Sequence, residues 1–195
     1  MHIVARPLGF LVCLLLFAQQ AVACACCAEE GHRSFSQLKI GEGATQYIQD
    51  LTENGPAWFV TGSCGTDCIT GVLDPLFEYQ PQLLITDEQI AIALSDIDGE
   101  LRGTLVMELP DQLTQFAVDP EPRFNGANDF VFLEARMDVS LTGTGDFSMI
   151  KNEVAEFILS GFGNNCANAG SFDSWAIQVE NEKAQFRLIG GLAVG

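Results

Sequence analysis

Residues 131–141 carry an apolar side chain at every odd position and, from residue 134 on, a polar side chain at every even position, and this alternation constrains the fold more than any other feature of the chain. Successive side chains on a β-strand point to opposite faces of a sheet, so one face of this segment is apolar and the other is polar. The pattern therefore predicts a long strand with one buried and one solvated face. The apolar positions are Val131, Leu133, Ala135, Met137, Val139 and Leu141.

The same period of two recurs in several shorter segments. Residues 89–95 and 100–109 flank the turn sequence DIDG and predict a β-hairpin, and residues 174–180 and 184–191 predict a second one. Residues 57–62 and 69–73 are interpreted as strands on either side of the turn SCGTDC. The periodicity of residues 150–159 fits a helix or a strand, and we favour a strand because its neighbours are strands.

These patterns predict a mainly β protein with a single antiparallel domain, either a β-sandwich or a β-barrel, over residues 24–195. Residues 44–51 carry apolar side chains at helical spacing before the breaker NGP, so a short N-terminal helix is expected there. The choice of architecture bears on function. A barrel of this size has room to enclose an apolar ligand, whereas a sandwich more often presents loops.

Residues 1–23 have the layout of a secretory signal peptide. A short basic start with Arg6 precedes an apolar run at residues 8–18 and small residues suited to cleavage after Ala23. The apolar run is too short for a transmembrane helix, and no later window is a candidate. We expect a cleaved, exported protein of the periplasm, the cell surface or the extracellular space, with no transmembrane span.

The junction AVAC at residues 21–24 also resembles a bacterial lipoprotein processing site, in which Cys24 would be lipidated. Position 21 is Ala, where Leu is usual in that motif. A membrane tether is expected only if Cys24 carries the lipid.

The charge of the chain excludes one class of partner. The sequence holds 26 acidic and nine basic residues, with a formal net charge of −17. Such a field repels phosphate backbones, so nucleic acid is not an expected partner. An acidic surface that keeps an exported protein soluble is the simplest interpretation.

Cysteine is the densest chemical signal, and it is concentrated in the N-terminal segment 24–35. Of the seven cysteines, Cys13 would leave with the signal peptide, and the six that remain are an even number in an exported chain, which predicts disulfides. We expect bonds that tie the N-terminal cluster to the SCGTDC turn and to residue 166. The candidates are Cys24, Cys26, Cys27, Cys64, Cys68 and Cys166.

A soft-metal site is the alternative interpretation of the same segment. Cys24, Cys26, Cys27 and His32 offer thiolates and an imidazole that suit copper or zinc. No paired C-x-x-C spacing supports this site, and no cofactor is otherwise expected.

Two irregular stretches are candidate ligand loops. Residues 119–130 contain Arg123 and Phe124, and residues 161–175 contain Asn164, Asn165 and Trp175. Amide groups of this kind recognise carbohydrate or backbone groups, although we favour a loop fixed by a disulfide for the second stretch.

Catalytic motifs are few. After residue 23 the chain has one histidine, His32, and none of the common nucleophile, phosphate or zinc-protease motifs occurs. We therefore favour a binding or interaction module, stabilised by disulfides, for an unknown protein, carbohydrate or small-molecule ligand. The soft-metal protein is one alternative, and a carboxylate-based hydrolase is another.

Overall fold

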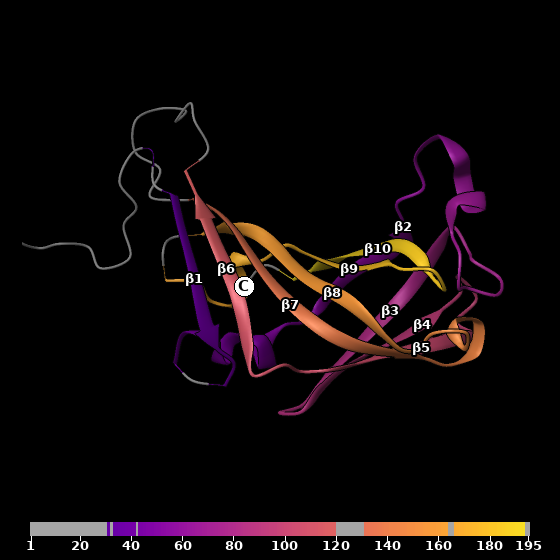
Figure 1. Ribbon diagram of the computed structural model, residues 1–195, viewed down its shortest axis with the longest axis horizontal. Helices are drawn as coiled ribbons and strands as arrows, with labels where there is room; N and C mark the ends of the chain where they lie inside the picture. The colour runs from indigo at the N-terminus through magenta and orange to yellow at the C-terminus, as the bar shows by residue number, and fades with distance from the viewer. Residues whose placement is uncertain (1–30, 32, 42, 120–130, 164–165, 194–195) are drawn as a thin grey trace, which may run out of the picture.

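The computed structural model describes residues 31, 33–41, 43–119, 131–163 and 166–193, and within them the fold is mainly β (Figure 1). The strands are β1 (Arg33–Lys39), β2 (Glu53–Phe59), β3 (Glu78–Ile85), β4 (Gln89–Ser95), β5 (Leu101–Glu108), β6 (Gln112–Val118), β7 (Val131–Gly143), β8 (Lys151–Gly163), β9 (Ser174–Glu180) and β10 (Gln185–Leu192). Four 3-10 helices accompany them: η1 (Gly43–Asp50), η2 (Gly62–Cys68), η3 (Gly145–Phe147) and η4 (Ala169–Ser171).

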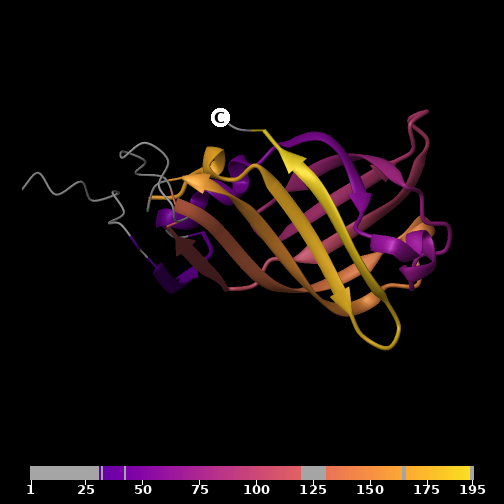
Figure 2. The ribbon, with the colours of Figure 1, turned by 90° about the horizontal axis from the view of Figure 1, so that it is seen from above.

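Eight of the strands close into an antiparallel barrel. The order around the barrel is β7, β5, β4, β3, β2, β10, β9 and β8, and β8 pairs in turn with β7, so the strands form a closed circle. The predicted single β domain is thus a barrel and not a sandwich. Figure 2 shows the strands crossing the barrel at a steep tilt, as closure of a twisted sheet requires.

The two remaining strands extend the sheet beyond the barrel wall through β7. The first half of β7, from Phe132 to Arg136, pairs with β6, while its last residues, from Ser140 to Gly143, pair with β5. Strand β1 then pairs with β6 and ends the sheet. One strand therefore belongs both to the closed barrel and to an open extension.

The register of the hairpins confirms the alternation that the sequence shows. In the β4–β5 hairpin Ile90 lies opposite Met107 and Ile92 opposite Leu105, and all four are fully buried. The β9–β10 hairpin pairs Ile177 with Leu188 in the same way. Residues 150–159, which periodicity left ambiguous, belong to β8.

Large aromatic side chains are packed in the core. An eight-stranded barrel has room for packed side chains or for one small ligand. Here the largest fully buried side chains include Trp175, Tyr79, Phe147, Phe157 and Phe172. The indole of Trp175 packs against the backbone of Gly190 on the neighbouring strand, where an added Cβ would lie 2.3 Å from the ring. The glycine is therefore part of how this interior accommodates its largest residue.

The 3-10 helices lie at the two ends of the barrel. Helices η1 and η4 lie at the end near β1, and η2 and η3 lie at the opposite end (Figures 1 and 2). In η1 the apolar residues Tyr47 and Ile48 are buried, and the Tyr47 ring lies 5.2 Å from that of Phe172. This segment is a 3-10 helix that covers one end of the core.

One predicted strand is absent from the described fold. Residues 69–73 form a loop with a single bridge between Thr70 and Gln185. Gly71 has a left-handed φ of 86°, and a Cβ at this position would lie 2.5 Å from that of Ala184. The prediction was wrong because this turn interrupts the strand geometry that the apolar residues alone suggested.

Candidate binding surface

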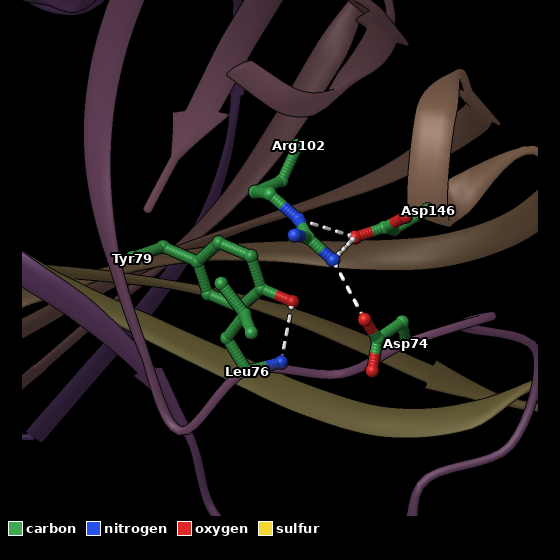
Figure 3. Close-up of polar contacts among 5 residues, drawn as sticks. All are labelled: Asp74, Leu76, Tyr79, Arg102 and Asp146. Atoms are coloured by element: carbon green, nitrogen blue, oxygen red, sulfur yellow. Dashed lines mark hydrogen bonds and ion pairs between the residues drawn. The ribbon is translucent and has the colours of Figure 1, made fainter. Parts of the chain in front are cut away.

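A network of ion pairs around Arg102 joins strand β5, η3 and the loop before β3 at one end of the barrel (Figure 3). The Arg102 guanidinium, at the start of β5, donates hydrogen bonds to the Asp146 carboxylate in η3 at 2.8 Å and to the Asp74 carboxylate at 2.7 Å. Asp74 lies in the loop between η2 and β3. These two hydrogen bonds raise the pKa of Arg102 above its usual value, chiefly through Asp146. The guanidinium and the two carboxylates thus satisfy one another, which is typical of ion pairs that stabilise a fold.

Tyr79 supports the same end from inside the barrel. Its hydroxyl accepts a hydrogen bond from the Leu76 backbone N–H at 2.9 Å, and burial raises its pKa. The backbone N–H of Leu73 donates to the Asp146 carbonyl at 2.7 Å. The loop between η2 and β3 is therefore bound to the barrel by polar contacts on both sides.

A second ionic cluster lies on the outer face near the other end of the barrel. Arg136 on β7 bonds to Glu134 on the same strand and to Glu156 on β8, and its guanidinium lies 5.4 Å from the centre of the Phe116 ring. The hydrogen bond to Glu134 is the main cause of its raised pKa. Here too the cation and the carboxylates satisfy one another.

An open groove lies on the outer wall between η2 and the β9–β10 hairpin. It has a volume of about 370 Å³ and is shallow. The residues that line it are Val60, Thr61, Cys68, Ile69, Gln178, Val179, Glu180, Gln185, Phe186 and Arg187. A disulfide between Cys64 and Cys68, with a Cα–Cα distance of 5.7 Å, closes η2 into a compact loop at one side of this groove.

Arg187 gives the groove its chemical character. It is exposed on β10 between Gln178, which lies opposite it on β9, and Val60, whose backbone N–H donates to the Arg187 carbonyl at 2.9 Å. In the described part of the chain Arg102, Arg136 and Lys183 each contact a carboxylate, whereas Arg187 contacts none. Its guanidinium is therefore available to a ligand.

Trp58 presents an apolar surface beside this cation. Its neighbours on β2, Ala57 and Phe59, point into the core, so the indole points outward, and 41% of Trp58 is exposed. Trp58 lies opposite Ile189 in the sheet, which makes it a diagonal neighbour of Arg187 on the same face. An exposed indole next to an unpaired guanidinium is the combination that dominates many binding sites.

The structure corrects two of the sequence-based predictions. Trp175, a candidate ligand residue, is 1% exposed and packs inside the barrel near Phe157, because it begins the inward-facing series of β9. Cys64 bonds to Cys68 and not to the N-terminal cluster, since closing a loop of a few residues costs little chain entropy. Cys166 is also disulfide-bonded.

The other candidates lie outside the described residues. These are Cys24, Cys26, Cys27, His32, Arg123, Phe124, Asn164 and Asn165, so the N-terminal metal site and the lipidation of Cys24 stay predictions. Among the residues that the structure describes, no three metal-ligating side chains come together. None of the helices described is long and apolar enough to cross a membrane.

Sequence reasoning did not single out Trp58 or Arg187. The sequence did contain a clue to Trp58. Alternate residues of a strand point to opposite faces, so Trp58 must point to the other face from its neighbours Ala57 and Phe59. No protein-family model, curated protein or solved structure matches the chain. The candidate site therefore rests on its own geometry.

Proposed function

We propose that this protein is an exported binding module that holds an acidic saccharide on the outside of its barrel, in the groove beside η2. The observation that carries the proposal is Arg187, an unpaired guanidinium in a groove of a protein whose net charge is −17. A guanidinium binds a carboxylate through two parallel hydrogen bonds, which gives both affinity and orientation.

The remaining polar groups of the groove favour a ligand rich in hydroxyls. Gln178 and Gln185 each offer amide donors and an acceptor, and Thr61 offers a hydroxyl. Glu180 also lines the groove, and its carboxylate would repel a simple anion but would accept hydrogen bonds from sugar hydroxyls. A sugar acid satisfies both charges of the site at once.

Trp58 supplies a surface for the apolar face of such a ligand. An indole combines a large flat apolar area with little conformational freedom, so ordering it costs little on binding. The packing of the core favours an external site as well, because the barrel strands themselves contribute large, fully buried aromatic side chains such as Trp175, Tyr79 and Phe157.

The proposed location rests on the sequence. The signal-like layout of residues 1–23 and the disulfide chemistry of a cysteine-rich chain both fit an oxidising compartment outside the cytoplasm. Acidic saccharides are accessible to a protein in such a compartment. The acidic surface would repel polyanions except where a local cation such as Arg187 receives them.

The experiment is calorimetric titration of the exported protein with a panel of uronate-containing and sialate-containing oligosaccharides, with neutral oligosaccharides of matched length as controls. Binding of an acidic member is expected, weakened about tenfold or more by Arg187→Gln. Trp58→Ala should also weaken it several-fold. Arg33→Gln and Phe35→Ala, which remove the same residue types at the distant strand β1, should leave binding unchanged.

Two outcomes would overturn the proposal. One is the absence of binding across the acidic panel. The other is binding that Arg187→Gln and Trp58→Ala leave intact, because the ligand would then be held elsewhere on the protein.

A further inference from the structure

Strand β1 is an open edge of the sheet. The barrel itself has no edges because β8 closes on β7, but the extension through β6 ends at β1, which pairs with β6 alone among the described strands (Figure 1). An edge strand offers a row of backbone N–H and C=O groups to another extended chain.

The register identifies which groups face outward. The Ile40 N–H donates to the Asp111 carbonyl at 3.0 Å, so Ile40 belongs to the residues that bond toward β6. Hydrogen-bonded and non-hydrogen-bonded pairs alternate in an antiparallel ladder, which places Leu38 and Ser36 in the bonded set. The backbone groups of Phe35 and Gln37 therefore point away from β6, toward the open edge.

The side chains along this edge are unlike the rest of the surface. Phe35 is 64% exposed, and its ring packs edge-on against Phe116 of β6 at 5.4 Å, which fixes its position. Arg33 precedes it by two residues and so lies on the same face, and it is exposed without a carboxylate contact among the described residues. Residues 33–41 contain no Asp or Glu at all.

We propose that β1 accepts an extended acidic segment of a partner protein, which adds a strand to the sheet. Main-chain hydrogen bonds to Phe35 and Gln37 would supply the affinity. A partner residue opposite Phe35 would be apolar, and one two positions away, opposite Arg33, would be acidic. The expected recognition element is thus an apolar and an acidic residue separated by one position in an extended chain.

A second copy of this chain fits the same edge less well. Two β1 strands that pair through their open edges place Arg33 opposite Gln37 or Lys39, according to register, so self-pairing gives Arg33 no carboxylate partner. Each copy also carries a net charge of −17, which opposes close approach. A heterologous acidic strand satisfies Arg33 and self-association does not.

The test uses the whole protein and a short labelled peptide, rich in Thr and Val, that carries one Glu two positions from one Leu. Binding followed by fluorescence anisotropy is expected, with a loss of about fivefold when the peptide's Glu becomes Lys. Hydrogen exchange then gives a residue-level readout. The peptide should slow exchange at the amides of Phe35 and Gln37 and leave those of Ser36 and Leu38, already bonded to β6, unchanged.

Two variants of the protein separate docking from folding. Gln37→Pro removes an outward-facing N–H that the β6 ladder does not use, so the fold should persist while peptide binding falls about tenfold. Arg33→Glu leaves the backbone intact and should reverse the preference, so that the Lys peptide binds better than the Glu peptide. Arg187→Gln and Trp58→Ala serve as controls, since the groove lies on another part of the barrel.

The proposal is overturned if the peptide fails to bind, or if it binds without protecting Phe35 and Gln37. It is also overturned if the protein forms dimers in solution that Gln37→Pro dissociates, because β1 would then pair with a second copy. A peptide that binds equally well with Glu or Lys would refute the role of Arg33.

Discussion

Arg102 Nε lies 2.8 Å from the Asp146 carboxylate, and this contact joins the start of β5 to the 3-10 helix that follows β7. The same guanidinium reaches Asp74 in the loop before β3. Three segments that are distant in sequence thus meet at one cation (Figure 3).

The two carboxylates at Arg102 should contribute unequally to stability. The Asp146 side chain is 20% exposed and that of Asp74 is 72% exposed, so solvent screens the second contact much more. Asp146→Asn should lower the urea midpoint clearly, and Asp74→Asn should change it little. Equal effects of the two substitutions would show that burial does not set their contributions.

The protein should lose stability at alkaline pH through Tyr47. Burial raises the pKa of Tyr47 from 10.0 to about 12, so the folded state resists the ionisation that the unfolded chain undergoes freely. Stability is fully present below pH 10 and falls as the pH rises toward 12, by about 3 kcal/mol from this residue. The free energy of unfolding, measured from about pH 8 to about pH 12, should show this decline, because that range extends roughly two pH units on either side of the ordinary tyrosine pKa.

Tyr47→Phe tests the assignment. The Tyr47 hydroxyl is buried without a hydrogen-bond partner among the described residues, so its removal should leave stability at neutral pH equal or raise it by about 1 kcal/mol. The alkaline decline should become shallower. It should not vanish, because the pKa of Tyr79 is raised as well.

The Cys64–Cys68 disulfide should stabilise the fold only modestly. The bond closes a loop of a few residues, for which the chain-entropy model gives about 2 kcal/mol. The double substitution to Ser should lower the free energy of unfolding by no more than this amount. It should weaken saccharide binding as well, since Cys68 lines the groove. A large loss of stability with unchanged binding would contradict both statements.

Gly190→Ala should destabilise the barrel through overpacking. The added Cβ would lie 2.3 Å from the Trp175 indole, and both residues are buried, so a loss of about 1–3 kcal/mol is expected. The double variant Gly190→Ala with Trp175→Phe should recover part of the loss. A denaturant-based double-mutant cycle measures that coupling, and additive effects would refute the contact.

Much of the sheet was predictable from the sequence because strands such as β4, β5 and β7 each have one buried and one more exposed face. The alternation at Ile90, Ile92, Leu105 and Met107 determines which side chains face the core, and the structure confirms it. Closure was not predictable in the same way, since a sandwich and a barrel need identical one-sided patterns. The deciding contact is the pairing of β2 with β10, which no local pattern encodes.

The candidate groove was harder to predict than the fold. Arg187 and Trp58 come from strands far apart in the sequence, and only the register of β2 with β10 makes them neighbours. Both tryptophans lie in apolar-looking segments, yet Trp58 points outward and Trp175 inward. Once the strand is known, the alternation of side chains along it predicts which tryptophan faces the core. The residue type alone does not predict this.

The seam between β2 and β10 also determines when the molecule can finish folding. It joins Ala57 near the beginning of the described chain to Gly190 near its end, so the circle of strands stays open until the last strand has been synthesised. Such long-range pairing forms slowly compared with a hairpin such as β9–β10. The complete barrel therefore forms only once β10, the last strand described, has paired with β2.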